Sequence, residues 1–181
     1  MTHDTTSRLR MMTPPPAEPL SLSEAKSFLR IDHTLEDALV LTAITAAREA
    51  AELHLRQVLI TRSYSYELVQ LSHVVRLPAG PAQTVEALYA YDRTGNATEV
   101  QSTNYRLTLD GHGLVFSHVP KAESFAVEYV AGLAENAAQV PALIKQGMLH
   151  HVAVLMEQRG TDAPMPVQSL QCYQPFRRVR L

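Results

Sequence analysis

The strongest constraint on the fold is the stretch from residue 35 to residue 57, which contains no proline or glycine. Its middle, residues 43–53, is rich in alanine and other good helix formers. Thr34 and Asp37 mark a helix start, and Glu36 and Asp37 place negative charge in the first turn, where the helix dipole favours it. We therefore predict a helix over residues 35–57, roughly 34 Å long at about 1.5 Å per residue.

This predicted helix has one apolar face and one charged face. The apolar face is made by Leu39, Ile44, Ala47, Ala51 and Leu55. The charged residues lie on another face and comprise Arg48, Glu49, Glu52 and Arg56. Small alanines at the contact positions allow a neighbouring helix to approach closely.

Two further helices are predicted, one on each side of the chain's middle third. Ser21 and Glu24 have the spacing of a capping box, which starts a short helix over residues 21–30. Pro141 suits a first helical position, and an apolar face continues to Gly160, which predicts a helix over residues 141–159. Residues 1–19 are polar and then rich in proline, so we expect a flexible arm with order beginning at residue 20.

Between these helices the sequence changes to strand patterns separated by turns. Strands are predicted over residues 60–68, 73–77, 85–91, 105–109 and 125–130. Gly, Asn and Asp mark the turns at residues 77–81, 92–96 and 110–113. The predicted fold is α+β, with a small helical bundle, an antiparallel sheet inserted at about residues 60–130 and an extended carboxyl-terminal tail. Residues 20–160 form the main domain, and residues 161–181 a linker and tail.

Composition excludes several classes of function. The chain is 46% hydrophobic and 19% charged with a formal net charge of -2, so it lacks the field needed for tight, sequence-independent DNA binding. Its single cysteine, Cys172, cannot form an internal disulfide, which fits an intracellular protein. Residues 1–12 lack the apolar core of a signal peptide, and no apolar run approaches the ~20 residues of a membrane span.

No motif for catalysis, a cofactor or a metal is found. His150 and His151 are adjacent, so on a helix they point about 100° apart and cannot share one ion. His112 and His118 flank a predicted strand without a recognisable set of ligands. We interpret His54 as a surface residue, the Glu36 and Asp37 pair as serving the helix dipole, and Cys172 as lacking a partner base. These patterns favour a binding or architectural role.

The last residues have two interpretations. Large apolar residues alternate with arginines and are interrupted by Pro175, a pattern too irregular for a helix of the core. In the first interpretation the end of the chain is a solvated basic terminus, which explains the arginines but not the large apolar residues between them. Aromatic and arginine side chains are also enriched where a segment docks on another protein, and residues 170–181, if extended, would reach about 40 Å.

Three blocks of the sequence, in this order, resemble the head-to-tail connector (adaptor) family of long-tailed phages, prophages and gene transfer agents. The first block comprises residues 18–26, 28–30 and 36–39. The second comprises residues 127–132, 140–141, 144–146 and 157–160. The third comprises residues 166–167, 170 and 175–177. The family often has a glycine-arginine pair after its second helix, where this chain has Leu55 and Arg56.

The resemblance implies a structural role and no enzymatic activity. It implies a ring of twelve subunits beneath the portal protein, in the neck of a virion or phage-like particle assembled in the host cytoplasm. It further implies that DNA passes through a channel without specific binding, that a stopper or tail protein binds the opposite face, and that no membrane is involved. The carboxyl-terminal tail would bind the portal through Leu170, Tyr173, Pro175, Phe176, Arg177, Arg178, Val179, Arg180 and Leu181.

Three alternatives are considered at this point. A DNA-recognition subunit of the packaging machinery would require a recognition helix with exposed basic side chains, and the alanine-rich helices of mixed charge disfavour it. Another ring protein of the neck, a stopper or a tail terminator, has similar size and role. A small enzyme of unfamiliar type, using histidines near the inserted sheet, would require a pocket around His112 or His118.

Overall fold

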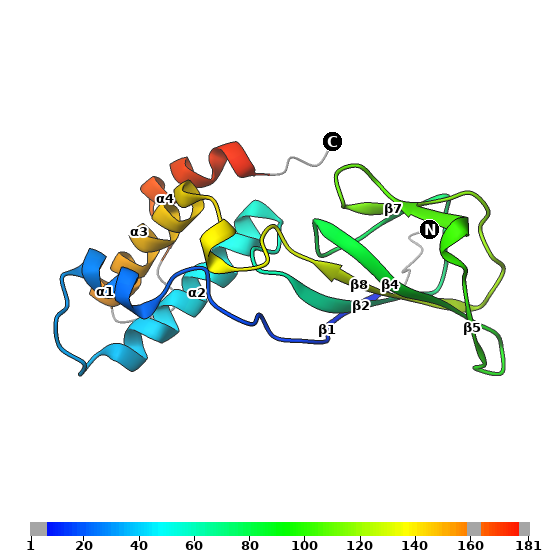
Figure 1. Cartoon of the computed structure of the whole chain (residues 1–181), viewed down its shortest axis with the longest axis horizontal. Coiled ribbons are helices and arrows are strands. Elements are labelled where there is room, and N and C mark those ends of the chain that lie inside the picture. Colours follow the sequence, from blue (N-terminus) through cyan, green and yellow to red (C-terminus); the bar gives the residue numbers. More distant parts are fainter. Residues whose placement is uncertain (1–6, 159–163, 178–181) are drawn as a thin grey trace. The chain divides into compact units, whose positions relative to one another are not determined.

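The computed structural model describes residues 7–158 and 164–177 of the chain (Figure 1). Internal contacts divide the chain into two compact units. The β unit comprises the residues up to Pro15 together with Thr61–Leu133, and the helical unit comprises Pro16–Ile60 together with the residues from Ala134 onward. The sheet is therefore inserted into the sequence of the helical unit, which confirms the predicted α+β class.

The larger sheet of the β unit has five strands in the order β1-β2-β8-β4-β5, and every neighbouring pair is antiparallel. Their bounds are β1 Arg8–Met11, β2 Arg62–Leu68, β8 Ser124–Ala131, β4 Ala82–Tyr91 and β5 Ala97–Glu99. In the register of β2 and β8, Tyr64 lies opposite Tyr129, and the two rings stack with centroids 5.8 Å apart. This aromatic pair lies in the core of the unit, where both side chains are buried.

A second sheet of three antiparallel strands has the order β3-β7-β6. It is formed by β3 Val74–Arg76, β7 Gly113–Phe116 and β6 Tyr105–Leu107, with the short helix η1 Ser102–Asn104 leading into β6. Leu114 and Phe116 of β7 are buried, as are Leu88 of β4 and Val127 of β8. Both sheets therefore contribute side chains to the core of the β unit. The edge strand β5 was not predicted, and β7 was predicted only as the strand that His112 and His118 flank, without bounds of its own.

The described residues of the helical unit form four α-helices: α1 Leu22–Leu29, α2 Asp37–Leu55, α3 Ala142–Gln158 and α4 Val167–Tyr173. Two short helices accompany them, η2 Ala137–Gln139 before α3 and η3 Gln174–Phe176 after α4. The capping box at α1 is confirmed, because Ser21 accepts a hydrogen bond from the Glu24 amide and the Glu24 carboxylate accepts one from the Ser21 amide. Among the helices of the described residues, none is long and apolar enough for a membrane span.

The core of the helical unit lies where α2 and α3 face each other. From α2 it receives Val40, Ile44, Ala47, Ala51 and Leu55, and from α3 it receives Ile144, Met148, Val152 and Leu155. The predicted apolar positions Ile44, Ala47, Ala51 and Leu55 are therefore confirmed. Leu39 is not part of this core, because 39% of it is exposed.

The amino-terminal arm contradicts the prediction that order begins at residue 20. Residues Arg8–Met11 form β1, which pairs with β2 along the edge of the larger sheet. The Ser63 amide donates a hydrogen bond to Thr13 Oγ1 at 3.0 Å. The sequence did not predict β1 because alternating residues in so short a strand give only a weak pattern. The hydrogen bonds of β1 come from β2, whose paired residues lie more than 50 positions later in the sequence.

Both α1 and α2 end at an arginine with a left-handed backbone conformation. Arg30 has a φ of 58° and Arg56 a φ of 56°. At this position of a helix end glycine is strongly favoured, because any Cβ is disfavoured sterically at positive φ. Glycine would therefore have a lower conformational energy than arginine at both positions.

We predict that Arg56→Gly will be more stable than Arg56→Ala by about 1 kcal/mol, because only the glycine relieves the left-handed conformation. Both variants remove the same side chain functional group, so Arg56→Ala controls for the loss of the guanidinium. Urea unfolding measures the difference. An alanine variant as stable as the glycine variant would contradict this account of the end of α2.

Candidate assembly interface

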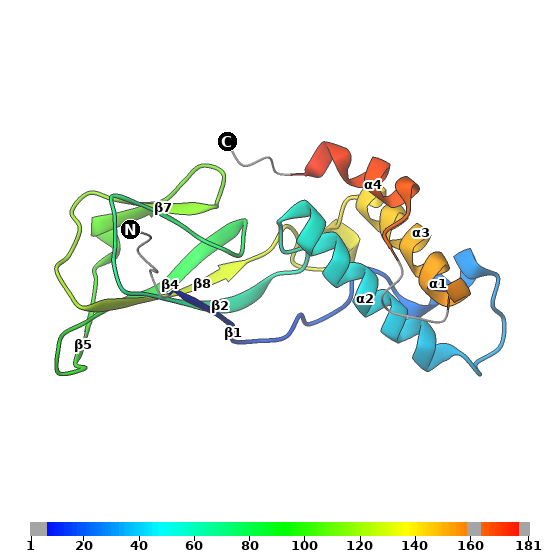
Figure 2. The ribbon, with the colours of Figure 1, turned by 180° about the vertical axis from the view of Figure 1, so that it is seen from behind.

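The carboxyl-terminal segment that sequence analysis singled out begins with a helix, α4, which lies along α3. The view of Figure 1 and the view from behind in Figure 2 both show the two helices side by side within the helical unit. Pro166 precedes α4, and its carbonyl oxygen accepts a hydrogen bond from the Leu170 amide. Ser169 and Tyr173 are one helical turn apart, and both are fully buried.

Gly147 of α3 makes this close packing possible. Ser169 Oγ donates a hydrogen bond of 2.6 Å to the Gly147 carbonyl oxygen. A Cβ atom added at Gly147 would lie 2.5 Å from Cε1 of the Tyr173 ring, which is closer than such atoms approach in real structures. The Tyr173 ring therefore occupies the space that a side chain at residue 147 would fill.

The end of α2 also contacts this segment. The rings of His54 and Tyr173 lie with centroids 6.0 Å apart, and Gln57 Nε2 donates a hydrogen bond of 2.6 Å to the Phe176 carbonyl oxygen. Burial lowers the pKa of His54, and the charge of Arg177 lowers that pKa further. Burial raises the pKa of Tyr173 above its ordinary value. These contacts fix residues 167–176 on both α2 and α3.

The prediction that this segment is too irregular to belong to the core is therefore wrong for residues 167–176. The apolar residues around Pro175 gave no clear helical period, and the sequence did not show that Gly147 leaves room for an aromatic ring on α3. Tyr173 is buried in its own helical unit, so its side chain is not available to a partner in this structure.

The other predicted tail residues differ in their exposure. Leu170 and Phe176 are half-buried, whereas Pro175 and Arg177 are exposed. Arg178, Val179, Arg180 and Leu181 lie outside the described residues. The candidate interface thus consists of a packed base, residues 167–176, followed by the residues from Arg177 onward.

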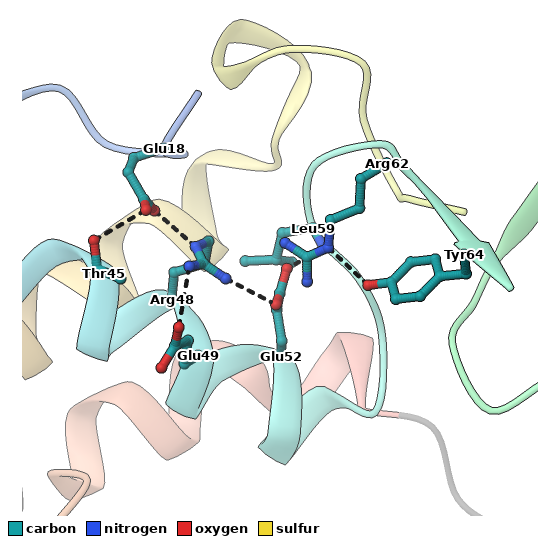
Figure 3. Close-up of polar contacts among 8 residues, drawn as sticks. All are labelled: Glu18, Thr45, Arg48, Glu49, Glu52, Leu59, Arg62 and Tyr64. Carbon is teal, nitrogen blue, oxygen red and sulfur yellow. Dashed lines mark hydrogen bonds and ion pairs between the residues drawn. The ribbon is translucent and has the colours of Figure 1, made fainter. Parts of the chain in front are cut away.

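A second polar feature of the helical unit is the ion cluster around Arg48, drawn in Figure 3. Arg48 is only 5% exposed, and its Nε and Nη1 donate to the carboxylates of Glu18 at 2.8 Å and Glu52 at 3.1 Å. Thr45 Oγ1 also donates to Glu18, and the Leu59 amide donates to Glu52 at 2.9 Å. The cluster therefore ties the segment before α1 and the segment after α2 to the middle of α2.

This cluster corrects the prediction that Arg48 lies on a charged face separate from the apolar face of its helix, because its side chain is buried. A buried guanidinium needs carboxylate partners, and Glu18 lies 30 residues before Arg48 in the sequence, beyond the reach of a helical pattern. Glu49, with its side chain 67% exposed, does lie on the solvated face. Figure 3 also draws Arg62 of the β unit, whose Nε donates a hydrogen bond of 2.7 Å to the Tyr64 hydroxyl.

The histidines and Cys172 are not gathered into a metal site in the part of the chain that the structure describes. No group of three or more His, Cys, Asp or Glu side chains there is arranged to hold a metal ion. His150 makes an edge contact with the Phe28 ring and lies 3.2 Å from Gln146 Nε2, whereas His151 is buried. Cys172 is half-buried on α4.

Comparison with known families gives the class of the protein. A family model described as "Phage gp6-like head-tail connector protein" matches residues 19–111. This match covers about half of the chain, and the chain belongs to the phage gp6-like head-tail connector family. The family is one of structural proteins and not of enzymes, which removes the enzyme alternative. A search of curated protein sequences found no match.

Solved structures similar to this chain come from gene transfer agent (GTA) particles. A chain in the neck of an empty GTA particle, computed with C6 symmetry, matches with a TM-score of 0.83 and 25% identity over 96% of this chain and 97% of the other. A chain in a native GTA virion matches with a TM-score of 0.80 and 25% identity over 96% of both chains. A chain in the neck of a native GTA particle, computed with C12 symmetry, matches with a TM-score of 0.78 and 24% identity over 96% of this chain and 97% of the other. The predicted connector fold is confirmed.

The packing of Tyr173 generates a prediction about stability. Its ring fills the space above Gly147, whereas its buried hydroxyl has no hydrogen-bond partner among the described residues. We predict that Tyr173→Ala will lose about 3–5 kcal/mol of unfolding free energy, because it leaves a cavity. Tyr173→Phe keeps the ring and removes the hydroxyl, so it will be as stable as the natural chain or more stable.

Denaturant unfolding of the two variants beside the natural chain measures both effects. The phenylalanine variant is the control for the ring itself. A Tyr173→Ala loss below about 1 kcal/mol, within the range of exposed positions, would show that α4 does not pack on α3 as described.

Proposed function

We propose that this chain forms a ring of twelve subunits between the portal protein and the stopper or first tail component of a phage or GTA particle. The observation that carries the proposal is the likeness, over nearly the full length of both chains, to a chain in a GTA neck. The C6 symmetry of that neck is compatible with twelve subunits, because a twelvefold ring also has sixfold symmetry. The family match supports the same role in joining head to tail.

The charge of the chain suits a ring through which DNA passes. Sixteen Lys and Arg residues are balanced by eighteen Asp and Glu residues, so the chain as a whole has no cationic excess to hold phosphate. Strong sequence-independent binding would release counterions from many phosphates and require clustered cations. We infer that the ring provides an open channel and does not grip the DNA.

Electron microscopy of the purified chain, alone and mixed with the portal of its own particle, tests this function. We expect a twelvefold ring with an open axis, bound at the narrow end of the portal. A chain that binds no portal and only joins tail components would instead be a stopper or a tail terminator. A chain that stays monomeric with both portal and tail components would contradict the ring itself.

We further propose that the end of the chain binds the portal, with α4 as its fixed base. The proposed contact residues are the half-buried or exposed side chains Leu170, Pro175, Phe176 and Arg177, together with Arg178, Val179, Arg180 and Leu181. Tyr173 is not included among these contact residues, because it is buried in its own subunit. Twelve equivalent weak contacts in one ring would bind far more strongly than one, because the contacts act at high effective concentration.

The packed base determines where the chain can be shortened for a test. Deleting residues 170–181 would remove Tyr173 and expose the surface around Gly147, so a loss of binding could reflect unfolding. Deleting residues 178–181 removes none of the hydrogen bonds or packing contacts of α4 described above.

We predict that deleting residues 178–181 will leave the unfolding free energy unchanged and lower portal affinity at least tenfold, a loss of about 1.4 kcal/mol or more in the measured binding free energy. The matched control is the double variant Arg8→Ala and Arg10→Ala, which removes two exposed arginines from β1 and so changes net charge as the loss of Arg178 and Arg180 does. Biolayer interferometry on immobilised portal measures both. Equal affinities for the deletion and the natural chain would reject the proposed tether.

A further inference from the structure

The chain crosses between the β unit and the helical unit three times. The crossings lie at residues 15–16, 60–61 and 133–134, where the division of the chain into its two units falls. Each unit fixes one end of every crossing, so the length and stiffness of these segments determine how far one unit can turn against the other. Two units joined by a single flexible linker would have no such restraint.

The second and third crossings run side by side. In the β unit, Gly132 approaches Thr61 so closely that a Cβ atom on Gly132 would overlap the Thr61 backbone. Gln83 Nε2 donates a hydrogen bond to Thr61 Oγ1 at 3.2 Å and another to the Gly132 carbonyl oxygen at 3.0 Å. In the helical unit, the Ala134 amide donates to the Leu59 carbonyl oxygen at 3.0 Å. Two crossings held together in this way join the units at one place and leave rotation about that place free.

The first crossing has an anchor of its own in each unit. In the β unit, strand β1 pairs with β2, and the Ser63 amide donates a hydrogen bond of 3.0 Å to Thr13 Oγ1. In the helical unit, the Glu18 carboxylate accepts hydrogen bonds from Arg48 at 2.8 Å and from Thr45 at 3.0 Å (Figure 3). The segment between Thr13 and Glu18 is therefore fixed at both ends.

The residues between these anchors, 14–17, are three prolines and an alanine, and we call them the proline strap. Proline fixes its own φ, and it disfavours the helical region for the residue before it. Four of the six residues from 13 to 18 precede a proline, so few backbone conformations are available to the strap. Its five Cα–Cα steps can span at most about 18 Å. The strap is therefore short and stiff, unlike a linker rich in glycine.

We propose that the proline strap is a conformational restraint, which limits rotation of the β unit against the helical unit about the paired crossings. Two adjacent crossings alone permit a hinge, whereas a third, stiff connection with its own anchors restricts the angles that the hinge can take. Such a restraint lowers the conformational entropy that the chain loses when both units bind neighbouring proteins. The inference concerns the free chain and does not depend on the proposed ring or on portal binding.

Distances between spin labels on the two units, measured by double electron–electron resonance, test this restraint. All chains carry Cys172→Ser, so that only introduced thiols are labelled. One label is at Leu53→Cys in the helical unit, where the leucine is 81% exposed, and the other is at Leu109→Cys in the β unit, where the leucine is fully exposed. The width of the distance distribution reports how freely the two units turn against each other.

Two variants loosen the strap. Pro14→Gly, Pro15→Gly and Pro16→Gly together keep its length and remove its stiffness, and six glycine and serine residues inserted between Pro16 and Ala17 lengthen it. We expect either variant to make the distance distribution at least twice as wide as it is with the natural strap. Pro164→Gly is the matched control, because it makes the same change at an exposed proline outside the strap, and it should leave the width unchanged.

A second pair of labels, at Leu9→Cys on β1 and at Leu109→Cys, lies within the β unit and reports whether β1 stays on its sheet. An unchanged width in both strap variants, or a natural strap that already gives the wide distribution, would overturn the proposal. Broadening that appears only when β1 detaches would also overturn it, because the restraint would then come from the strand and not from the prolines. Chains that broaden as expected but never form rings would refute the proposed function and leave this inference intact.

Discussion

The contact between Tyr173 and Gly147 is the interaction on which the arrangement of the carboxyl-terminal segment depends. A ring from α4 occupies the position that a side chain on α3 would otherwise take, and Ser169 adds a hydrogen bond to the same backbone carbonyl. Burial of an aromatic ring in such a site contributes several kcal/mol. The segment therefore has a base, residues 167–176, that belongs to its own subunit, and we propose that the end from Arg177 onward binds a partner.

A second constraint holds the remaining parts of the helical unit on α2. The guanidinium of Arg48 joins Glu18 before α1 and Glu52 within α2, and Glu52 in turn accepts from the Leu59 amide. Removing one member of such a buried cluster leaves the others without compensation, which is far more destabilising than loss of a surface pair. The segments before α1 and after α2 are thus fixed on α2, as suits a subunit that must meet its neighbours in a defined geometry.

The sequence predicted the features that depend on neighbouring residues. The helix over residues 37–55, the capping box at Ser21 and the strands β2, β4 and β8 all follow from local propensity and period. The features it missed depend on residues distant in the sequence. Strand β1 needs β2, the burial of Arg48 needs Glu18, and α4 needs the missing side chain at Gly147. The functional class was inferred from three blocks of residues, and the family match confirms it. The sequence did not show that residues 167–176 form a packed base, and only the structure reveals it.

The role of the chain as a connector accounts for the distribution of its surfaces. A connector has to present one surface to its own copies and others to different proteins, and we propose that the arginine-containing end of this chain serves the latter. Its balanced charge suits the proposed passage of DNA without binding. No reactive group is required for any of these contacts, in agreement with the structural family to which the chain belongs.

Hydrogen exchange of the chain, free and bound to portal, tests the division of the tail most directly. The amides of α4 should be protected in both states, because α4 packs on α3 without a partner, and the amides from Arg178 to Leu181 should gain protection only in the complex. Exchange of the α4 amides at the rate of an unfolded peptide in the free chain, with protection appearing only on the portal, would contradict the account.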